Sequence, residues 1–248
     1  MIGRVTPPLV LLHAFPLDSR MFDGIRPAVA ARTRLLTPDL RGFGAGRPLG
    51  DAPPDLTVLA DDVLAELDAA GVERAIIGGV SMGGYIALNL LRRHPDRVAG
   101  LVLADTRSGA DDTAALERRR TAAERADRGE IAAGPDAIAP LVAQAASDLV
   151  RADLAVLAAA VPAATIAWGQ RAMAGRPDST AALAATRVPV LVVVGEQDAV
   201  TPPAAAREMA ATAPEAELIE LPGVGHLSPA EDPVGFADAV IGWLSRRF

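Results

Sequence analysis

The chain has 248 residues, of which half are hydrophobic and 3% aromatic, and its formal net charge is −7. This length suits one α/β domain with an insertion. The acidic balance argues against a nucleic-acid or anionic-membrane surface, and the absence of cysteine excludes disulfides, thiolate catalysis and cysteine metal sites. No apolar run is long enough to span a bilayer and no signal pattern opens the chain, so a cytoplasmic location is expected.

The first half of the chain alternates short apolar runs with helical patterns, as a parallel α/β sheet requires. Leu9–Leu12 is a buried-strand run, and a second strand is expected over Arg34–Thr37. A helix is expected to follow through Ala70, with Asp55 or Thr57 as its capping residue. This order of elements predicts strands joined by helical crossovers.

The stretch Arg74–His94 contains a strand, a sharp turn and a helix. Ala75–Ile77 is typical of a strand buried on both faces, and helical spacing begins after Ser81. Gly79 and Gly83 flank this serine in a G-x-S-x-G pattern, where a larger side chain would collide with the neighbouring strand and helix. The spacing does not match the G-x-G-x-x-G of a dinucleotide-binding turn. The turn is predicted to point the Ser81 hydroxyl out of the sheet, beside the first amides of the helix.

Residues 108–185 differ in composition and predicted secondary structure from the rest of the chain. They combine charged helical stretches with alanine-rich ones and contain no clear strand. This predicts a helical cap over 108–185, inserted into an α/β core formed by 1–107 and 186–248. The run Glu117–Arg120 (ERRR) is interleaved with acidic residues, so a solvated helix face is predicted there rather than an anion site.

Strand and helix signals flank this insertion on both sides. Val98–Leu103 precedes it as a predicted strand, and Val188–Val194 follows it as a strongly apolar one. A helix over Pro203–Thr212, a last strand over Leu218–Leu221 and a C-terminal helix containing Trp243 complete the pattern. Both halves are expected to form one sheet with right-handed crossovers.

Three residues of complementary chemistry fall just past predicted strand ends: Ser81, Asp198 and His226. Ligands bind beyond the carboxyl ends of parallel strands, so these side chains are expected to meet there. A histidine base can activate a serine hydroxyl, and an aspartate can fix the imidazole tautomer. Asp105, which ends the preceding strand, is the alternative acid. Asp198 is favoured, because Asp105 could instead be a turn or cap residue and Asp198 lies four or five residues too early to cap the helix that begins near Pro203.

The other two histidines have simpler explanations. His13 is expected to brace the loop that follows it through a hydrogen bond, and His94 ends a helix, where a cation suits the helix dipole. No pair of histidines has metal-ligand spacing. Neither a metal nor a cofactor is therefore expected.

Four segments resemble motifs of the α/β-hydrolase superfamily: HAFPLD, GGVSMGG, GEQDAVTPP and GVGHLSPAEDP. The resemblance covers nearly the whole chain and implies the α/β-hydrolase fold, a mostly parallel sheet flanked by helices with a helical cap. It also implies an oxyanion hole formed by the backbone N–H groups of Phe15 and Met82, although Ala14 replaces the usual glycine of that loop. The family has two further strands before the first one found here, so the N-terminal hairpin is expected to be largely absent.

The segment around Ser81 resembles small esterases and the 3-oxoadipate enol-lactonase group. This implies a carboxylic-ester hydrolase that acts on small or medium esters through an acyl-enzyme, with a small-molecule partner and no nucleic-acid or membrane partner. Lactone hydrolysis, C–C hydrolysis and a perhydrolase side activity use the same triad, and a non-catalytic ligand-binding protein is the alternative of another class. A serine at this position argues against dehalogenases and epoxide hydrolases. The oligomeric state is not predicted.

Three residues of the insertion are candidates for lining the pocket. Trp168 and Met173 are apolar, and the alternative for both is packing within the cap. Arg171 follows Trp168 by three residues and so shares its helix face. It could bind a substrate carboxylate bidentately, and the alternative is an exposed arginine on the cap surface.

Overall fold

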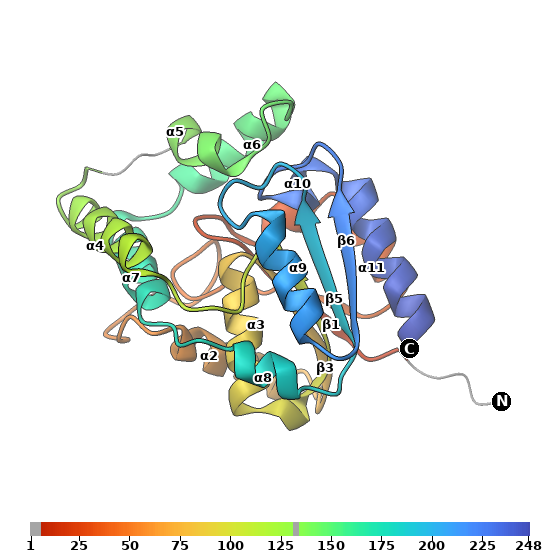
Figure 1. Ribbon diagram of the computed structural model, residues 1–248. Helices are drawn as coiled ribbons and strands as arrows, with labels where there is room; N and C mark the ends of the chain where they lie inside the picture. Colours follow the sequence, from red (N-terminus) through yellow and green to blue (C-terminus); the bar gives the residue numbers. More distant parts are fainter. Residues whose placement is uncertain (1–5, 131–133) are drawn as a thin grey trace.

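The computed structural model describes residues 6–130 and 134–248. Its six strands form one parallel sheet in the order β2–β1–β3–β4–β5–β6 (Figure 1). The strands are β1 (Leu9–Leu12), β2 (Leu35–Leu36), β3 (Ala75–Val80), β4 (Val98–Ala104), β5 (Val190–Gly195) and β6 (Ala216–Leu221). The predicted α/β-hydrolase fold with a parallel sheet is therefore confirmed.

Helices cover both faces of this sheet (Figure 1). One face carries α2 (Leu56–Ala69), α3 (Met82–Arg93), α8 (Thr180–Ala185) and α9 (Pro203–Thr212), which pack side by side in that order. The other face carries α1 (Arg26–Ala30) and α11 (Pro233–Arg247). The central strands β1, β3, β4 and β5 are buried along their whole length, which explains their continuous apolar runs.

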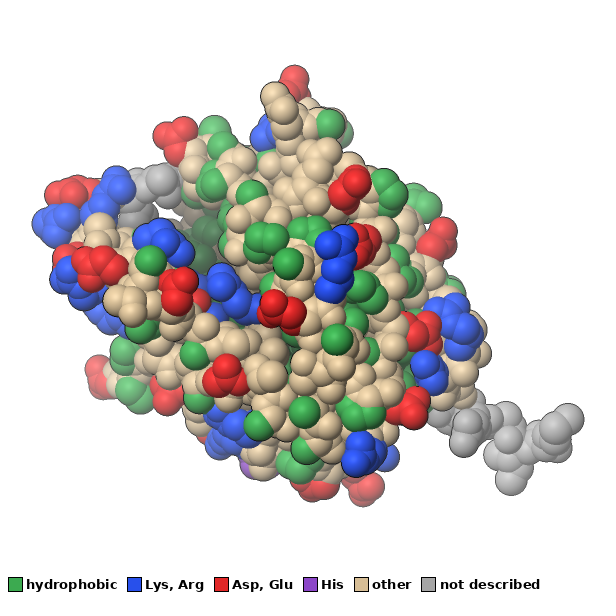
Figure 2. All heavy atoms as spheres, in the orientation of Figure 1, with side chains coloured by type: hydrophobic (Ala, Val, Ile, Leu, Met, Phe, Trp, Pro, Cys, Tyr) green, Lys and Arg blue, Asp and Glu red, His purple; other side chains and the backbone are tan. Residues whose placement is uncertain are grey.

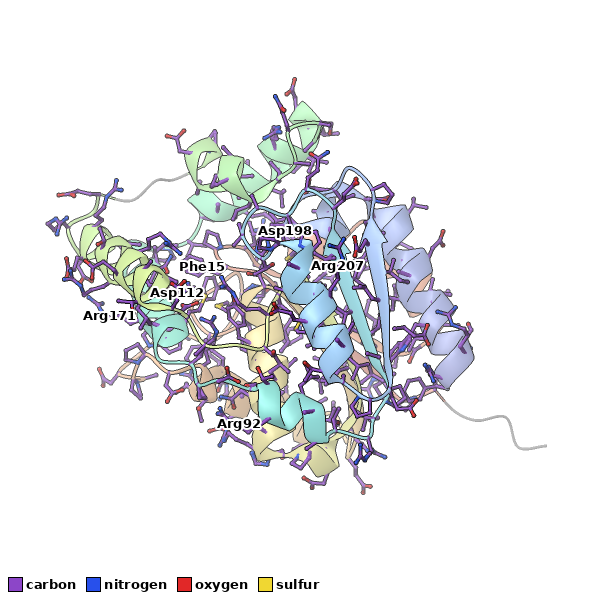
Figure 3. The ribbon with its side chains drawn as sticks, viewed as in Figure 1. Phe15, Arg92, Asp112, Arg171, Asp198 and Arg207 are labelled. Atoms are coloured by element: carbon purple, nitrogen blue, oxygen red, sulfur yellow. The ribbon has the colours of Figure 1, made fainter. Side chains whose placement is uncertain are left out.

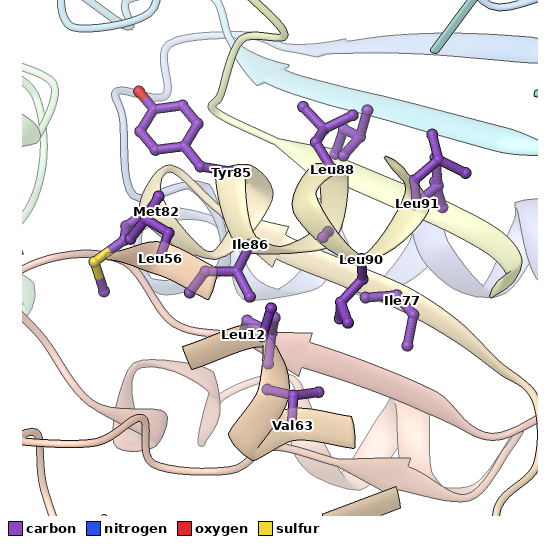
Figure 4. Close-up of a cluster of buried hydrophobic side chains, with 14 of the residues drawn as sticks. Leu12, Leu56, Val63, Ile77, Met82, Tyr85, Ile86, Leu88, Leu90 and Leu91 are labelled. Atoms are coloured by element: carbon purple, nitrogen blue, oxygen red, sulfur yellow. The ribbon is translucent and has the colours of Figure 1, made fainter. Parts of the chain in front are cut away.

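The sheet separates two hydrophobic clusters because successive side chains of a strand point to opposite faces. In β1, Val10 and Leu12 belong to the cluster under α2 and α3, whereas Leu9 and Leu11 belong to the one under α11. Figure 4 shows the first cluster, in which Leu12 meets side chains of α2 and α3. Every residue of α3 from Met82 to Leu91 is buried, so this helix is held from all sides.

The start and end of α2 follow local rules. Asp55 is its N-cap, and the carboxylate accepts a hydrogen bond from the backbone N–H of Thr57 at 2.7 Å. Gly71 follows the last turn with a φ of 66°, a conformation that glycine adopts without strain. Of the two capping residues left open by the sequence, the structure therefore uses Asp55.

The insertion between β4 and β5 is helical in its described residues. It contains α4 (Thr113–Asp127), α5 (Pro135–Ile138), η3 (Ala139–Leu141), α6 (Asp148–Ala159) and α7 (Ala163–Ala174), followed by α8. Helices α4 and α7 pack against each other, while α5 pairs with α6 (Figure 1). The last of these helices, α8, packs instead between α3 and α9 in the layer over the sheet.

Three short helices occupy the remaining loops: η1 (Ser19–Phe22), η2 (Pro95–Arg97) and α10 (Ser228–Glu231). Residues 6–8 precede β1 without forming a strand. The expectation about the N-terminal hairpin otherwise concerns residues 1–5, which lie outside the described part of the chain. Within the described ranges, no single helix is long and apolar enough to cross a membrane; α6 and α7 satisfy that test only as a pair, bent by 95°.

Candidate active site

Ser81 lies between the end of β3 and the start of α3, in a backbone conformation that non-glycine residues rarely adopt. Its φ is 54° and its ψ is −111°. A Cβ atom on Gly79 would lie 2.2 Å from the carbonyl carbon of Gly83, and one on Gly83 would lie 2.1 Å from the carbonyl oxygen of Leu12. Glycine is required at both positions because the obstructing atoms are backbone, which cannot move aside as a side chain can.

Two hydrogen bonds join Ser81, His226 and Asp198 in one line. Ser81 Oγ lies 2.8 Å from His226 Nε2, and His226 Nδ1 lies 2.8 Å from Asp198 Oδ2. The serine comes from the end of β3, the aspartate from the loop after β5 and the histidine from the loop after β6. All three lie beyond carboxyl ends of parallel strands, where the sequence placed them.

Asp198 is held as a carboxylate by several donors. Its Oδ1 accepts hydrogen bonds from the backbone N–H groups of Val200 and Thr201, both at 2.8 Å, and its Oδ2 accepts one from the Thr201 hydroxyl at 2.7 Å. Burial works to raise the pKa of Asp198, but the hydrogen bond and charge of His226 and the donors of Thr201 outweigh it, and the pKa lies below its usual value. The carboxylate is therefore suited to keep the Nδ1 proton of His226 in place.

Asp105, the alternative acid, forms a separate set of hydrogen bonds. Its Oδ1 accepts from the backbone N–H of Gly195 at 3.0 Å, while Oδ2 accepts from the N–H and the hydroxyl of Ser228 at 3.0 and 2.6 Å. Burial, reinforced by the charge of Asp198, raises the pKa of Asp105 to about 7, against the attraction of His226 and the Ser228 donors. Asp105 thus links the end of β5 to Ser228, two residues after His226, without bonding the imidazole.

The loop after β1 carries the first of the two backbone amides expected in an oxyanion hole. His13 is fully buried, and burial lowers its pKa, which favours the neutral ring. Its Nε2 accepts a hydrogen bond from the N–H of Leu40 at 3.1 Å, so Nδ1 carries the proton and donates to the carbonyl of Ala14, also at 3.1 Å. His13 therefore braces the loop that leads to Phe15, as the sequence predicted.

Neither expected amide takes part in the backbone hydrogen bonds formed by the described residues. Met82 is the first residue of α3, so its N–H has no acceptor within the helix. The Phe15 ring lines the cavity above Ser81 and meets the ring of Phe43 edge to face, with centroids 6.1 Å apart. Both N–H groups are thus without a backbone acceptor among the described residues, which is the condition for either to bind an oxygen of a ligand.

A cavity of about 320 Å³ opens above Ser81 and His226, between the sheet and the insertion. Most of its wall is apolar and comes from both parts of the chain, through Phe15, Leu141, Ile166, Met173 and Val200. Its charged lining residues are Arg119, Arg125 and Glu130, at and after α4. Figure 2 shows α4 from outside, with arginines and acidic residues side by side on its exposed face.

The three insertion residues expected at the pocket have different positions. Met173 lines the cavity. Trp168 does not, because its ring packs in the core and its Nε1–H donates to the carbonyl of Ala52 at 2.9 Å. Arg171 points away from Phe15 and Asp198 (Figure 3) and forms an ion pair with Asp127 on the surface between α7 and α4. Arg171 thus adopts its alternative, an exposed arginine on the cap surface. Trp168 adopts neither of its two expected positions, because its ring joins the hydrophobic cluster under α2 and α3 and its N–H bonds Ala52 of the core.

The solvated face predicted for the ERRR run holds for Arg120, whose side chain is 60% exposed, but not for Arg119, which is 17% exposed and lines the cavity. Sequence reasoning also passed over Thr201. The spacing Asp-x-x-Thr after a strand is a recognisable signal, because an aspartate side chain readily bonds backbone amides two and three residues on. No comparable signal distinguishes Arg119 from its neighbours.

Within the described ranges, no group of three or more histidine, aspartate or glutamate side chains has a geometry that could hold a metal ion.

The fold and this arrangement of serine, histidine and aspartate define a class of proteins, and the comparisons agree with it. The family model described as the alpha/beta hydrolase fold matches residues 7–233. The chain therefore belongs to the α/β-hydrolase fold family, and its named relatives support a hydrolase.

The relatives include enzymes of more than one specificity. The chain is 33% identical to a pimeloyl-[acyl-carrier protein] methyl ester esterase of Aromatoleum aromaticum, over 91% of this chain and 94% of that protein. Its structure is similar to that of a thermophilic esterase from Thermogutta terrifontis, with a TM-score of 0.90, 34% identity and coverage of 98% and 90% of the two chains. It is also similar to an enol-lactonase from Burkholderia xenovorans LB400, with a TM-score of 0.85, 27% identity and coverage of 97% and 92%.

Proposed function

We propose that this protein is a serine hydrolase of carboxylic esters. The observation that carries the proposal is the line of two 2.8 Å hydrogen bonds from Ser81 through His226 to Asp198 at the floor of the cavity. A nucleophile, a base within hydrogen-bond reach and a group that orients the base are the parts that acyl transfer needs. The esterases among the relatives agree with it.

In the first half of the reaction, Ser81 Oγ attacks the ester carbonyl carbon as its proton passes to His226 Nε2. The N–H groups of Phe15 and Met82 donate hydrogen bonds to the oxyanion that forms. The carbon–oxygen bond to the alcohol then breaks, and His226 returns the proton to the leaving oxygen. In the second half, a water molecule gives its proton to His226 and attacks the acyl-enzyme, which releases the acid and regenerates the serine.

We further propose that helices α4 to α7 act as the cap of this site, because Arg119, Ile166 and Met173 of these helices line the cavity. The cavity lies near the small end of the roughly 300–1,000 Å³ range of ligand pockets, which favours small or medium esters. A lactone is a cyclic ester and would pass through the same steps, and the similarity to an enol-lactonase favours it as the second candidate.

The experiment compares wild type with Ser81→Ala on p-nitrophenyl butyrate, a small lactone and a fluorophosphonate probe. Ser179→Ala is the control, because Ser179 is also a buried serine but lies outside the cavity. Wild type and the control should hydrolyse at least one substrate and be labelled, while Ser81→Ala should lose about 10⁴-fold or more in kcat. An unlabelled wild-type protein would refute the proposal and favour a non-catalytic ligand-binding protein.

A further inference from the structure

Positively charged residues outnumber negatively charged ones beside the cavity. On the α4 side of the cavity, the charged lining residues and the residues linked to them by ion pairs comprise four arginines and two acids: Arg119, Arg125, Arg128, Arg176, Asp111 and Glu130. This leaves a local surplus of two positive charges in a chain whose formal net charge is −7. Such a surplus, placed over a cavity with mostly apolar walls, raises the local concentration of anions.

Arg119 is the more strongly held of the two lining arginines. Its Nε–H is paired with Asp111, and its Nη1 donates to Gln170 Oε1 at 3.1 Å. Within residues 6–130 and 134–248, its Nη2 has no hydrogen-bond partner. The guanidinium is thus fixed in orientation while one of its nitrogens remains free to bind, which lowers the entropy lost on binding.

Asp111 does not cancel the charge of Arg119, because it is shared with a second arginine. Its side chain is fully buried and also accepts a hydrogen bond from Arg176 Nη2 at 2.7 Å. Burial opposes its charge, but the two guanidinium groups outweigh burial and lower the pKa of Asp111 to about 2. Arg176 in turn lies 4.0 Å above the ring of Tyr85, which lines the cavity. The cluster therefore carries one net positive charge.

Arg125 supplies the second positive charge. It is exposed at the cavity and forms no ion pair with any described residue. Glu130 lines the same rim, but its carboxylate is engaged by both Nε and Nη2 of Arg128, at 2.9 and 3.1 Å. Asp198 holds a negative charge at the opposite end of the cavity. An anion would therefore be drawn toward α4 and away from the triad.

We infer that Arg119 and Arg125 form a carboxylate-binding subsite, and that the substrates are esters or lactones which carry a second, free carboxylate some carbons away from the reacting carbonyl. This inference rests on the proposed function, since it names the substrate class of that same site. The Arg125 guanidinium can match a carboxylate with two parallel hydrogen bonds, and Arg119 can add one from its Nη2. The apolar walls between the two ends suit the carbon chain that joins the two groups.

The test uses two pairs of substrates that differ only in this charge. Monomethyl glutarate and its amide, methyl 4-carbamoylbutanoate, place the group on the acyl side. Carboxymethyl butyrate and carbamoylmethyl butyrate place it on the alcohol side. A charge-assisted hydrogen bond should favour the carboxylate over the amide by roughly tenfold to hundredfold in kcat/KM in at least one pair.

The variants are Arg119→Gln and Arg125→Gln, with Arg120→Gln as the matched control on the same helix. Arg120 is exposed and pairs with Glu117 and Glu124, outside the cavity. Each variant is scored by its ratio of kcat/KM values for carboxylate and amide, because this ratio does not depend on the fraction of protein that folds. Arg125→Gln keeps the test valid if the loss of Arg119 from Asp111 destabilises α4.

The ratio should fall severalfold or more in both subsite variants and stay unchanged in Arg120→Gln. Equal rates on carboxylate and amide in both pairs would overturn the inference and leave the ester hydrolase standing. A preference that survives in both subsite variants would overturn the assignment to these arginines. Failure to hydrolyse any of the four esters, together with absent fluorophosphonate labelling, would instead refute the proposed function.

Discussion

Replacing Asp105 with asparagine separates two roles that the sequence left open, because asparagine keeps the shape of the side chain and removes its charge. In the structure the two carboxylate oxygens accept three hydrogen bonds, from the N–H of Gly195 and from the N–H and hydroxyl of Ser228. An asparagine has one acceptor oxygen, so its NH₂ group must face at least one backbone N–H. A buried donor left without an acceptor costs about 1–3 kcal/mol.

The same substitution also removes the ionisable proton of Asp105 and with it the pH dependence that this residue gives to the stability of the fold. Asp105 has a pKa of about 7 in the folded chain and 3.8 as its ordinary value, so the folded state binds its proton more tightly. A raised acid pKa means that stability falls as pH rises between these two values. The difference between the two pKa values corresponds to a loss on the order of 4 kcal/mol in the free energy of unfolding by pH 8. Asp105→Asn should therefore be less stable than wild type at pH 4 and equally or more stable at pH 8.

Urea unfolding followed by circular dichroism at several pH values between 4 and 8 gives this difference directly. When the two proteins are compared at each pH, the contributions of most other ionisable groups to the free energy of unfolding cancel. A stability difference that grows in favour of wild type as pH rises would refute the argument, since it would mean that the three donors stabilise the carboxylate more than burial destabilises it. The activity of Asp105→Asn should stay within about tenfold of wild type, because its carboxylate does not bond the imidazole.

The remaining predictions concern the line from Ser81 to Asp198. Asp198→Asn should lower kcat by about 10⁴-fold in an ester assay with little change in fold. If Asp105→Asn lowers kcat more than Asp198→Asn does, Asp105 is the acid of the triad. Thr201→Val removes the hydroxyl that donates to Asp198 and should cost about 1.5–3 kcal/mol in urea unfolding. Gly83→Ala should lower both stability, by about 1–3 kcal/mol or more, and activity, because its Cβ would lie 2.1 Å from the Leu12 carbonyl oxygen. A Gly83→Ala variant with wild-type activity and melting temperature would contradict the tight packing of that turn.

The elements and the meeting of Ser81, Asp198 and His226 could be predicted because both depend on local rules. Apolar runs mark buried strands, and parallel strands bring their carboxyl ends to one edge. The face that α4 turns to the cavity could not be predicted, because it depends on packing against α7 across a long stretch of sequence. Arg119 and Arg120 are neighbours in a charged run, yet one lines the cavity and the other is exposed. The hydrogen bond from Trp168 to Ala52 could not be predicted either, because the two residues are 116 positions apart in the chain and meet only through tertiary packing.

Ser81 and Asp105 share a property that bears on the evolution of this chain. They are the two non-glycine residues with positive φ in the described ranges, at 54° and 45°. They stand at the ends of adjacent paired strands, β3 and β4. A left-handed conformation costs a non-glycine residue roughly 1–2 kcal/mol, which glycine would largely avoid. At Asp105, glycine would leave the donors of Gly195 and Ser228 without their acceptor, so the strain there is offset by hydrogen bonds. At Ser81, by contrast, a library selected for heat resistance alone would favour glycine, so that a gain in melting temperature would come with the loss of the hydroxyl that the proposed chemistry needs.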